Sequence, residues 1–405
     1  MKKVILYSGS YPYGKTTESF IGPELNVMSN SNEYEITIVP VVKDDYQREL
    51  PSSVKLDNSI CECGILYKIK SCFGILNRLF IKELWKERKE ITSFSYFLMA
   101  IKYLYATNLV LRDVEKRASA YENLTFYGFW LSYVPVAFAV YKINNPQTPH
   151  TFISRGHRCE VYTTELGLFY PLRRLLYNNI DKVYVCSDTG KDYLRNKYPF
   201  AANRITRAYL GVEENKREVT SNDSDCIKVV SCSSVYQFKR VDLILSSLSS
   251  FCRKHLEYSI EWTHFGGGTL FEELKTQVDE CHVPNLTIKL MGSLDNNRIL
   301  KYYREEYFDF FIHLSTSEGL PVSMMEAIAS SIPVLATDVG GVSELVTEQT
   351  GKLLTVDFNQ EEFDEALLYM INNRADLSLE AKKFFDANFN AKNNYPKFYK
   401  EITSL

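Results

Sequence analysis

The segment 315–346, "STSEGLPVSMMEAIASSIPVLATDVGGVSELV", combines carboxylates, a proline and glycines at a spacing that suits recognition of an anion. A strand-like run, "DFFIHLS", ends just before it. Pro321 stands where a helix would begin, because a first-turn residue needs no N–H donor. The amides of Val322 and Ser323 would then point at a ligand with the helix dipole behind them, an arrangement that suits a diphosphate.

Two glutamates flank this expected anion site. Glu318 lies in the loop before the expected helix, which runs from about 322 to 330, and Glu326 lies in its second turn. Carboxylates repel phosphates but accept hydrogen bonds well from sugar hydroxyls. We therefore expect one of them to hold a ribose and the other to hold a second sugar. For Glu326 alone, the alternative is a capping or pairing role on a helix surface.

Short apolar runs alternate with helix-length segments along the whole chain. Continuous apolar strands of this kind predict parallel sheets that are covered on both faces, the doubly wound α/β class. The polar, charged segment 211–225 separates two sets of runs and is the best linker candidate. We expect two Rossmann-like domains that face a central cleft, with ligands at the carboxyl ends of the strands. The runs are 3–8, 34–42, 124–129, 150–155 and 181–187, then 226–234, 260–266, 286–292, 309–315, 332–339 and 352–356.

The bulk composition is that of an ordinary soluble protein. The 405 residues suffice for two or three domains, and the net charge of −3 speaks against general nucleic-acid binding. The nine cysteines are scattered and odd in number, so we expect reduced thiols in a cytoplasmic protein, and the N-terminal apolar run is too short for a signal peptide. The apolar stretch 126–143 is long enough to span a membrane, but Gly128 and Pro135 favour a buried strand followed by a core helix.

The sequence resembles the family-4 retaining glycosyltransferases, which have the GT-B fold. "EGLPVSMME" has the E-x7-E pattern of that family, and "SIPVLATDVGGVSE" resembles the signature that follows it. In 230–248, Lys239 matches the phosphate-binding lysine of the family, whereas Ser234 stands where the family has an arginine. Arg240 and Arg155 are the candidates to replace that arginine.

The resemblance extends over nearly the whole chain. "HFGGGTLFEEL", with Gly267, is similar to the glycine turn beneath the nucleotide, and "LMGSL", with Gly292, to the base-side loop. "FISRGHRCEVYTTE" resembles the R-x-H-x-x-D-x-Y pattern of some bacterial members, so His157 matches the sugar-site histidine, while Glu160 replaces the aspartate. The family implies an acceptor-side domain over 1–210, the linker, a donor domain over 226–385, and a helix over 386–405 that packs back on the first domain.

The loop "GSYPYGKT", residues 9–16, fits two interpretations. It satisfies the G-x-x-x-x-G-K-[ST] pattern of P-loop NTPases through Gly9, Gly14, Lys15 and Thr16. The acidic residue that such a site needs at a second strand end is missing, apart from Asp188 two residues beyond a strand, and an NTPase gives no reason for the 318–326 segment. The resemblance instead implies a glycine loop over the donor phosphates, which glycine lets the backbone approach closely.

The resemblance therefore implies retaining transfer of a sugar from a nucleotide sugar, with UDP the preferred carrier, to a glycan or lipid-linked saccharide in bacterial surface-polysaccharide synthesis. No cofactor and no metal are expected. Glu318 would hold the donor sugar, Glu326 the ribose, and His157 would orient the sugar or acceptor. The catalytic candidates are Glu318, His157 and Lys239; the donor-binding candidates are Gly9, Gly14, Arg155, Lys239, Arg240, Gly267, Gly292, Glu318, Gly319, Leu320, Pro321, Val322, Ser323 and Glu326.

Two further classes of function stay open, together with one possible partner surface. They are a GT-B epimerase acting on a sugar nucleotide, and a non-catalytic sugar-nucleotide-binding subunit, which the serine at 234 would explain. The segment 65–90 has more basic than acidic residues, and an apolar face on it would suit the inner face of an anionic membrane; a core-packed helix is the alternative. That face comprises Ile75, Leu76, Leu79, Phe80 and Leu84, and the basic face comprises Arg78, Lys82, Lys86 and Lys89.

Overall fold

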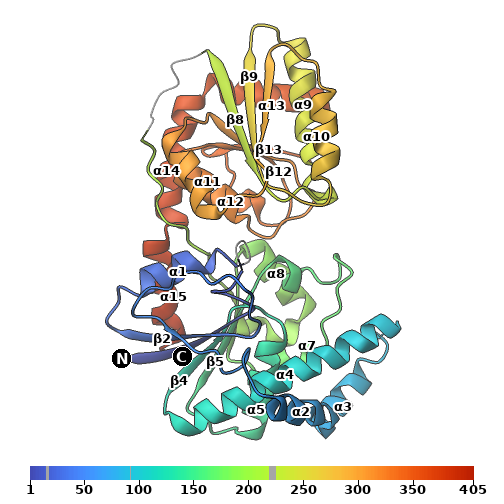
Figure 1. Ribbon diagram of the computed structural model, residues 1–405, viewed down its shortest axis with the longest axis vertical. Coiled ribbons are helices and arrows are strands. Elements are labelled where there is room, and N and C mark those ends of the chain that lie inside the picture. The colour runs from blue at the N-terminus through green and yellow to red at the C-terminus, as the bar shows by residue number, and fades with distance from the viewer. Residues whose placement is uncertain (15–17, 92, 219–224) are drawn as a thin grey trace. The chain divides into compact units, whose positions relative to one another are not determined.

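The computed structural model describes residues 1–14, 18–91, 93–218 and 225–405, which form two compact units (Figure 1). Unit 1 comprises Met1–Tyr209 and Tyr395–Leu405, and unit 2 comprises Leu210–Asn394. The boundaries differ from those expected. The described part of 211–225 belongs to unit 2, where Asn215 Nδ2 donates to Leu300 O and to Ser330 Oγ, both at 2.9 Å. At the C-terminus, unit 1 takes up the chain only from Tyr395, inside the last helix.

Unit 1 is built on a seven-stranded sheet in the order β3-β2-β1-β4-β5-β6-β7, and all its pairings are parallel. The order reverses between β1 and β4, which makes that point the topological switch of the sheet. The strands are β1 (Lys2–Ser8), β2 (Tyr34–Pro40), β3 (Lys55–Leu56), β4 (Leu124–Gly128), β5 (Thr151–Gly156), β6 (Lys182–Val185) and β7 (Ile205–Arg207).

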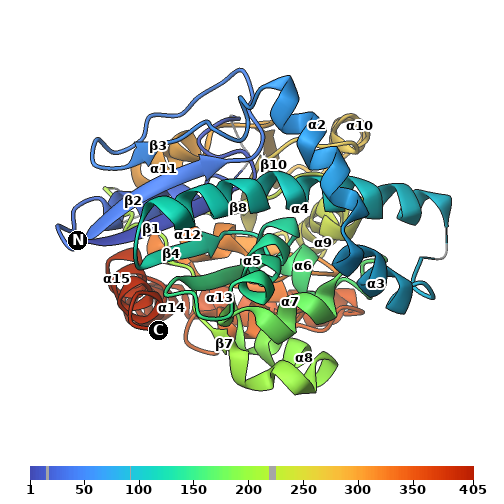
Figure 2. The ribbon, with the colours of Figure 1, turned by 90° about the horizontal axis from the view of Figure 1, so that it is seen from below.

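Helices cover both faces of this sheet. Helix α5 packs between α4 and α7, and α2 lies against α4 (Figure 2). The helices of unit 1 are α1 (Ile21–Met28), α2 (Ile65–Phe73), α3 (Arg78–Lys86), α4 (Phe94–Ala120), α5 (Tyr133–Asn144), α6 (Arg158–Val161), α7 (Arg173–Asn179), α8 (Asp188–Lys197) and, from Tyr395 on, α15 (Ala391–Ile402), with 3-10 turns at Gly74–Leu76 and Pro199–Arg204.

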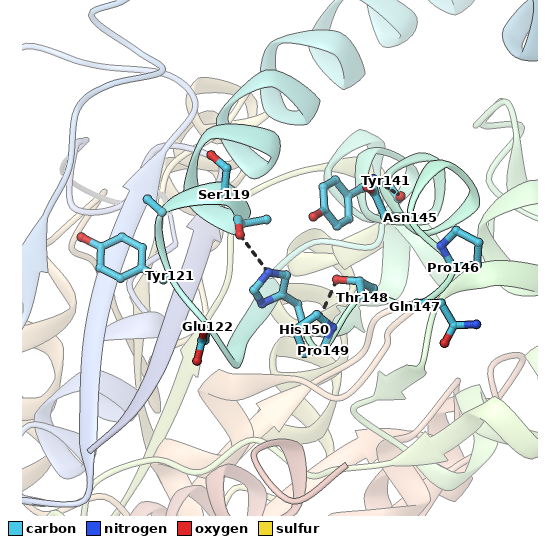
Figure 3. A pocket seen from close by; sticks show the side chains of 12 residues that line it. Ser119, Tyr121, Glu122, Tyr141, Asn145, Pro146, Gln147, Thr148, Pro149 and His150 are labelled. Carbon is cyan, nitrogen blue, oxygen red and sulfur yellow. Dashed lines mark hydrogen bonds between the residues drawn. The ribbon is translucent and has the colours of Figure 1, made fainter.

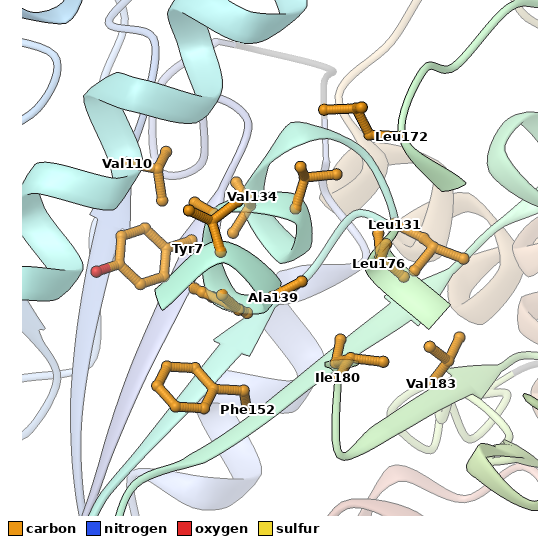
Figure 4. Close-up of a cluster of buried hydrophobic side chains, with 14 of the residues drawn as sticks. Tyr7, Val110, Leu131, Val134, Ala139, Phe152, Leu172, Leu176, Ile180 and Val183 are labelled. Atoms are coloured by element: carbon orange, nitrogen blue, oxygen red, sulfur yellow. The ribbon is translucent and has the colours of Figure 1, made fainter. Parts of the chain in front are cut away.

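The core of unit 1 lies between the sheet and α4, α5 and α7 (Figure 4). The Phe126 and Phe152 rings stack with centroids 4.9 Å apart, and Tyr7 reaches from β1 to donate its hydroxyl to Asp113 at 2.7 Å. The apolar stretch 126–143 is the end of β4 followed by α5, whose residues 134–140 are all buried, so the prediction of a strand plus a core helix is confirmed. Among the described residues, α4 alone is long and apolar enough to cross a membrane, and 44% of its most apolar window is buried inside the protein.

Unit 2 repeats the doubly wound plan with six parallel strands in the order β10-β9-β8-β11-β12-β13. Its switch point lies between β8 and β11. The strands are β8 (Cys226–Cys232), β9 (Ser259–Phe265), β10 (Leu286–Leu290), β11 (Phe310–His313), β12 (Val334–Thr337) and β13 (Gly351–Leu354); the helices are α9 (Val241–Lys254), α10 (Phe271–Asp279), α11 (Asn296–Glu305), α12 (Val322–Ala329), α13 (Gln360–Asn372) and α14 (Arg374–Asn388), with 3-10 turns at Gln237–Lys239 and Val342–Glu344.

The core of unit 2 includes buried side chains of α9, α13 and the sheet, among them Trp262 of β9, which is fully buried. Each of the eleven apolar runs expected to be a strand overlaps one. Among the described residues, the strands that the sequence did not predict are β3 and β7, which are two and three residues long and lie at the edges of the sheet of unit 1. Such short edge pairings leave no hydrophobic period to detect.

Candidate functional site

The loops after β8 and β11 meet at the switch point of unit 2. Lys239, in the loop after β8, places Nζ 2.5 Å from Glu318 Oε1, in the loop after β11. His313, the last residue of β11, donates from Nε2 to the same carboxylate oxygen at 2.7 Å. Two of the three catalytic candidates, 79 residues apart in the chain, therefore lie in direct contact at the edge where doubly wound sheets bind ligands.

The electrostatics of this cluster keep Glu318 ionised. Burial opposes its charge, but the hydrogen bonds from His313 and Lys239 outweigh burial and lower the pKa of Glu318 to about 2. Burial lowers the pKa of His313, although Glu318 acts in the opposite direction. With a proton on Nε2, the imidazole of His313 donates the hydrogen bond to Glu318.

Helix α12 starts beside this cluster, as the sequence predicted. It spans Val322–Ala329, and Pro321 is its N-cap residue rather than its first helical residue. The amides of Met324 and Met325 are the first to bond inward, both to Pro321 O, at 3.2 and 3.3 Å. The amides of Val322 and Ser323 therefore have no partner within the helix and stand at its positive end, next to Leu320.

Glycines hold the surrounding loops in close contact. At Gly340, with φ of 58°, an added Cβ would lie 2.0 Å from Glu318 O, and the Gly341 amide donates to Gly319 O at 2.7 Å. On the other side, the Gly266 amide donates to Gly292 O at 2.9 Å, and a Cβ on Gly267 would meet Ser293 Oγ at 2.6 Å. Backbone thus meets backbone in two pairs of neighbouring loops, those after β11 and β12 and those after β9 and β10.

Glu326 faces a different part of the same edge. It is buried, and Asn296 Nδ2 of α11 donates to its Oε1 at 2.9 Å. Burial raises the pKa of Glu326 to about 7, and the Asn296 hydrogen bond only partly offsets this. Glu326 is thus buried rather than on a helix surface, but its carboxylate does pair with a neighbouring helix, as the alternative interpretation of a pairing role expected.

Arg240, a candidate to replace the missing arginine, is bonded to backbone carbonyl groups in this structure. Its guanidinium donates to Leu314 O at 2.5 Å and to Val356 O at 2.8 Å, so it ties the loops after β11 and β13 together. Its backbone is left-handed, with φ of 47°, directly before α9. Ser234 is exposed in the loop after β8.

The switch point of unit 1 holds an anion nest that is filled by the protein's own side chain. The carboxylate of Glu18 accepts from the amides of Gly9, Ser10 and Tyr11 at 2.8, 2.6 and 2.5 Å. Trp130 Nε1, after β4, donates to it as well. The Gly9 amide, which we expected to approach a donor phosphate, therefore binds Glu18 in this structure.

Gly14 lies at the far end of the same loop. Its amide donates to Tyr46 O at 2.8 Å, and its φ of 86° explains why glycine stands there. Lys15 and Thr16 lie outside the described residues. Among the described residues the first helix begins at Ile21, after a turn at 18–20.

His157 lies near this nest, at the start of α6. Its ring lies 4.7 Å from the Trp130 ring, and its Nε2 is 3.2 Å from Phe129 O, which requires a donor. Burial and the charge of Arg155 lower the pKa of His157 to about 3, so the ring is neutral and is suited to orienting a ligand rather than to taking up a proton. Glu160 accepts from the His157 amide at 3.1 Å and completes a capping box.

Arg155 is not available to a donor, contrary to expectation. Its side chain is fully buried, with the guanidinium 4.3 Å from the centroid of the Phe398 ring of α15. Burial raises the pKa of Glu24 and the charge of Arg155 lowers it, which places the two groups within electrostatic reach. Arg155 therefore helps to hold α15 in unit 1.

Two hollows of unit 1 differ in the side chains that line them. One, of about 570 Å³, is lined by the end of α4, by Tyr141 of α5 and by loop residues around His150, at the amino end of β5 and away from the carboxyl edge (Figure 3). Both ring nitrogens of His150 are engaged, by the Leu124 amide and Ala118 O. The other, of about 900 Å³, is lined by charged residues of 83–90 and by the aromatic rings of Phe169, Tyr170, Tyr198 and Phe200.

Sequence reasoning missed four residues that contact the candidates: Glu18, Trp130, Asn296 and His313. His313 carried a signal, since it is the ionisable residue of β11 and stands at the carboxyl end of that strand. Glu18 and Trp130 lie 112 residues apart and meet only because β1 and β4 are neighbours in the sheet.

The comparisons with known proteins fit this geometry. Solved structures similar to the whole chain include Anabaena HepE in complex with UDP, with a TM-score of 0.68 at 14% identity, and Staphylococcus aureus TarM, with 0.69 at 14%; each match covers 100% of both chains. A likeness at this identity shows the fold, and the fold is GT-B. Residues 212–384 are similar to the family described as "Glycosyl transferases group 1", and this match lies within unit 2.

Curated relatives match over shorter segments. The O-antigen biosynthesis glycosyltransferase WbnH of Escherichia coli is 37% identical over 108 residues, 27% of this chain and 28% of WbnH. The lipopolysaccharide core biosynthesis mannosyltransferase LpsB of Rhizobium meliloti is 31% identical over 188 residues, 45% of this chain and 49% of LpsB. The chain thus matches between about a quarter and half of these relatives' lengths, and the resemblance to glycosyltransferases of bacterial surface polysaccharides is confirmed.

Proposed function

We propose that this protein is a retaining glycosyltransferase that transfers a sugar from a nucleotide sugar, with UDP as carrier, to a glycan or lipid-linked saccharide. The observation that carries the proposal is the cluster of Lys239, Glu318 and the start of α12 at the switch point of unit 2. The ammonium of Lys239 and the free amides at the start of α12 suit a diphosphate, and the carboxylate of Glu318 beside them suits sugar hydroxyls. The UDP held by the HepE structure supports the choice of carrier.

The reaction that suits these groups breaks the bond between the anomeric carbon and the diphosphate. Lys239 and the amides of Val322 and Ser323 stabilise the negative charge that the departing diphosphate gains. Glu318 orients the donor sugar, and Glu326 accepts from the ribose hydroxyls. The acceptor hydroxyl attacks from the face that the diphosphate leaves, and its proton passes to a leaving phosphate oxygen, so no protein nucleophile and no metal are part of the proposal.

We place the acceptor on unit 1 and the protein in the cytoplasm, at the inner face of the membrane. The hollow lined by Phe169, Tyr170 and Phe200 supports the first assignment, because aromatic rings beside charged groups suit a saccharide. His157 and Trp130 form a second aromatic surface at the carboxyl edge of that sheet.

The test is turnover of UDP- and GDP-sugars with saccharide acceptors, followed by NMR of the product. We expect release of nucleoside diphosphate with UDP-sugars in the presence of EDTA, and a product that keeps the anomeric configuration of the donor. Glu318→Ala is expected to lower the turnover at least about a hundredfold, a loss of about 3 kcal/mol. Glu272→Ala, an exposed carboxylate on α10, is the matched control. Full turnover by the Glu318→Ala variant would contradict the assignment.

A further inference from the structure

Among the side chains that the structure describes in 65–99, ten large apolar ones are exposed, on α2, on α3 and on the first turns of α4. On α2 they recur at spacings that place them on one face, and on α3 Ile81 and Trp85 lie one turn apart. Trp85 is 65% exposed and Phe94 is 74% exposed. We call this set the apolar patch; it comprises Ile65, Leu66, Ile69, Phe73, Ile81, Trp85, Phe94, Phe97, Leu98 and Met99.

This patch is not the face that the sequence suggested. Phe80 is fully buried, and Ile75, Leu79 and Leu84 pack against the core of unit 1, so that face holds the helices to the domain. The side chain of Leu76 lies outside the described residues. The segment is therefore apolar on two faces, one facing the core and one facing outward. So many exposed apolar side chains within one segment of the chain indicate an interaction site.

The charges around the patch indicate what covers it. Residues 65–99 contain seven lysines and arginines and three glutamates, a net charge of +4 (7 − 3), whereas the whole chain carries −3. Lys68, Lys70, Lys82 and Lys89 are exposed among the apolar side chains. Of the glutamates, Glu83 pairs with Lys86 at 2.5 Å, and Glu87 accepts from the Leu172 amide at 2.7 Å. A second copy of the chain would bring a further +4 against this surface, which disfavours self-association.

We propose that the apolar patch docks the protein onto a bilayer that contains anionic lipids. Tryptophan, phenylalanine and leucine side chains enter the boundary between headgroups and acyl chains, and the lysines bind the anionic headgroups. Their long aliphatic stems allow the ammonium groups to reach the headgroups while the helix lies in the interface. The helices lie on the surface and do not span it, since the later turns of α4 pack in the core through Leu104, Val110 and Val114.

Docking would also place the neighbouring hollow of unit 1 next to the membrane. The segment that carries Ile81 and Trp85 also lines the 900 Å³ hollow through Glu83, Lys86 and Glu87. A docked protein would hold this hollow beside the headgroups, where the saccharide of a lipid-linked acceptor lies. The docking deepens the membrane placement made under the proposed function, and this last step also rests on the acceptor assigned there.

The experiment is co-sedimentation of the full-length protein with vesicles of phosphatidylglycerol and phosphatidylcholine, or of phosphatidylcholine alone. We expect binding to the anionic vesicles only, weakened at least tenfold by high salt. The double variant Trp85→Ser/Phe94→Ser should bind at least tenfold more weakly, and Lys82→Glu/Lys89→Glu should lose the preference for phosphatidylglycerol. The matched control is Leu256→Ser/Leu379→Ser, which removes apolar side chains that are 77% and 56% exposed in unit 2.

Three outcomes would overturn the proposal: no binding of the wild type, equal loss in the control variant, or a wild-type dimer that the Trp85→Ser/Phe94→Ser variant dissociates in sedimentation velocity. The last outcome would make the patch an interface between copies. Unchanged melting temperatures show that the variants fold. UDP binding by the same samples reports on the proposed function separately, so the failure of one idea is distinguishable from the failure of the other.

Discussion

Lys239 and Glu318 show how a single residue pair serves two needs at the carboxyl edge of unit 2. In this structure the ammonium neutralises a buried carboxylate at 2.5 Å. A diphosphate at the start of α12 would share that ammonium, while Glu318 keeps the hydrogen bond from His313. Lys239 can therefore turn toward a phosphate while the buried carboxylate of Glu318 keeps a partner, His313.

The first prediction concerns this ammonium. Lys239→Ala should weaken UDP binding about 10- to 100-fold, since a charge-assisted hydrogen bond contributes about 1.5–3 kcal/mol. Isothermal titration calorimetry measures the change. Lys289→Ala is the control, because Lys289 also pairs with a glutamate, Glu261, at 2.8 Å, but on the strands β10 and β9. Equal affinities in the wild type and Lys239→Ala would contradict the role of Lys239.

Glu326 predicts a pH dependence of stability. Its pKa is raised to about 7 in the folded protein by burial, so the folded state favours the protonated form. The stability that this gives is fully present below the unfolded pKa of about 4.5 and is lost as the pH rises toward 7, with a total of up to about 3 kcal/mol. Glu326→Gln should therefore flatten the decline in the free energy of unfolding between these pH values.

Denaturant unfolding at a series of pH values checks this difference. Glu272→Gln, an exposed residue of α10, is the control and should follow the wild-type curve. Parallel curves for the wild type and Glu326→Gln would show that Glu326 does not titrate in this range. Under the proposed function, the ionised carboxylate of Glu326 accepts hydrogen bonds from the ribose hydroxyls. The affinity for UDP should therefore increase as the pH rises through about 7.

At the scale of elements, the loops at the strand ends depend on close backbone contact. Gly340 and Gly167 both have left-handed backbones, with φ of 58° and 61°. A Cβ at Gly340 would lie 2.0 Å from Glu318 O, whereas at Gly167 it would meet nothing within 4 Å. Substitutions at the two glycines therefore distinguish the cost of backbone strain, common to both, from the cost of moving the Glu318 loop, expected at Gly340 alone.

Gly167→Ala should cost only the strain, about 1 kcal/mol, and should leave UDP binding intact. Gly340→Ala should cost about 3 kcal/mol and should also weaken UDP binding, because the Glu318 loop must move. Thermal unfolding and calorimetry measure both quantities. Equal effects of the two substitutions on UDP binding would contradict the assignment of this loop.

The loop after β1 makes a further prediction at this scale. Glu18→Ala removes the carboxylate that the amides of Gly9, Ser10 and Tyr11 share. The variant should lose about 1–3 kcal/mol of stability, because buried donors lose their acceptor. Inorganic phosphate should then stabilise the variant more than the wild type, since three adjacent amides form an anion site. Melting curves with phosphate test this, with Glu33→Ala as an exposed control; an equal phosphate effect in all three proteins would contradict it.

At the scale of the whole molecule, much of the architecture was predictable because apolar strand runs and turn residues are local signals. The start of α12 belongs to the same class, since Pro321 marks it. The contacts of Arg155 and Arg240 were not predictable, because a position near a strand end does not reveal which way the side chain points. Arg155 points into the contact with α15, and Arg240 points back at two carbonyl groups.

The central claim is that the protein binds the nucleoside diphosphate of a nucleotide sugar without a metal. The measurement that tests it most directly is a thermal-shift panel of UDP, GDP, UDP-sugars, Mg-ATP and Mg-GTP, with and without EDTA. A ligand at about a hundredfold over its Kd should stabilise the protein by about 2.7 kcal/mol. The account predicts a shift with UDP or a UDP-sugar that persists in EDTA. A shift with Mg-ATP or Mg-GTP alone would contradict it and would restore the P-loop interpretation of residues 9–16.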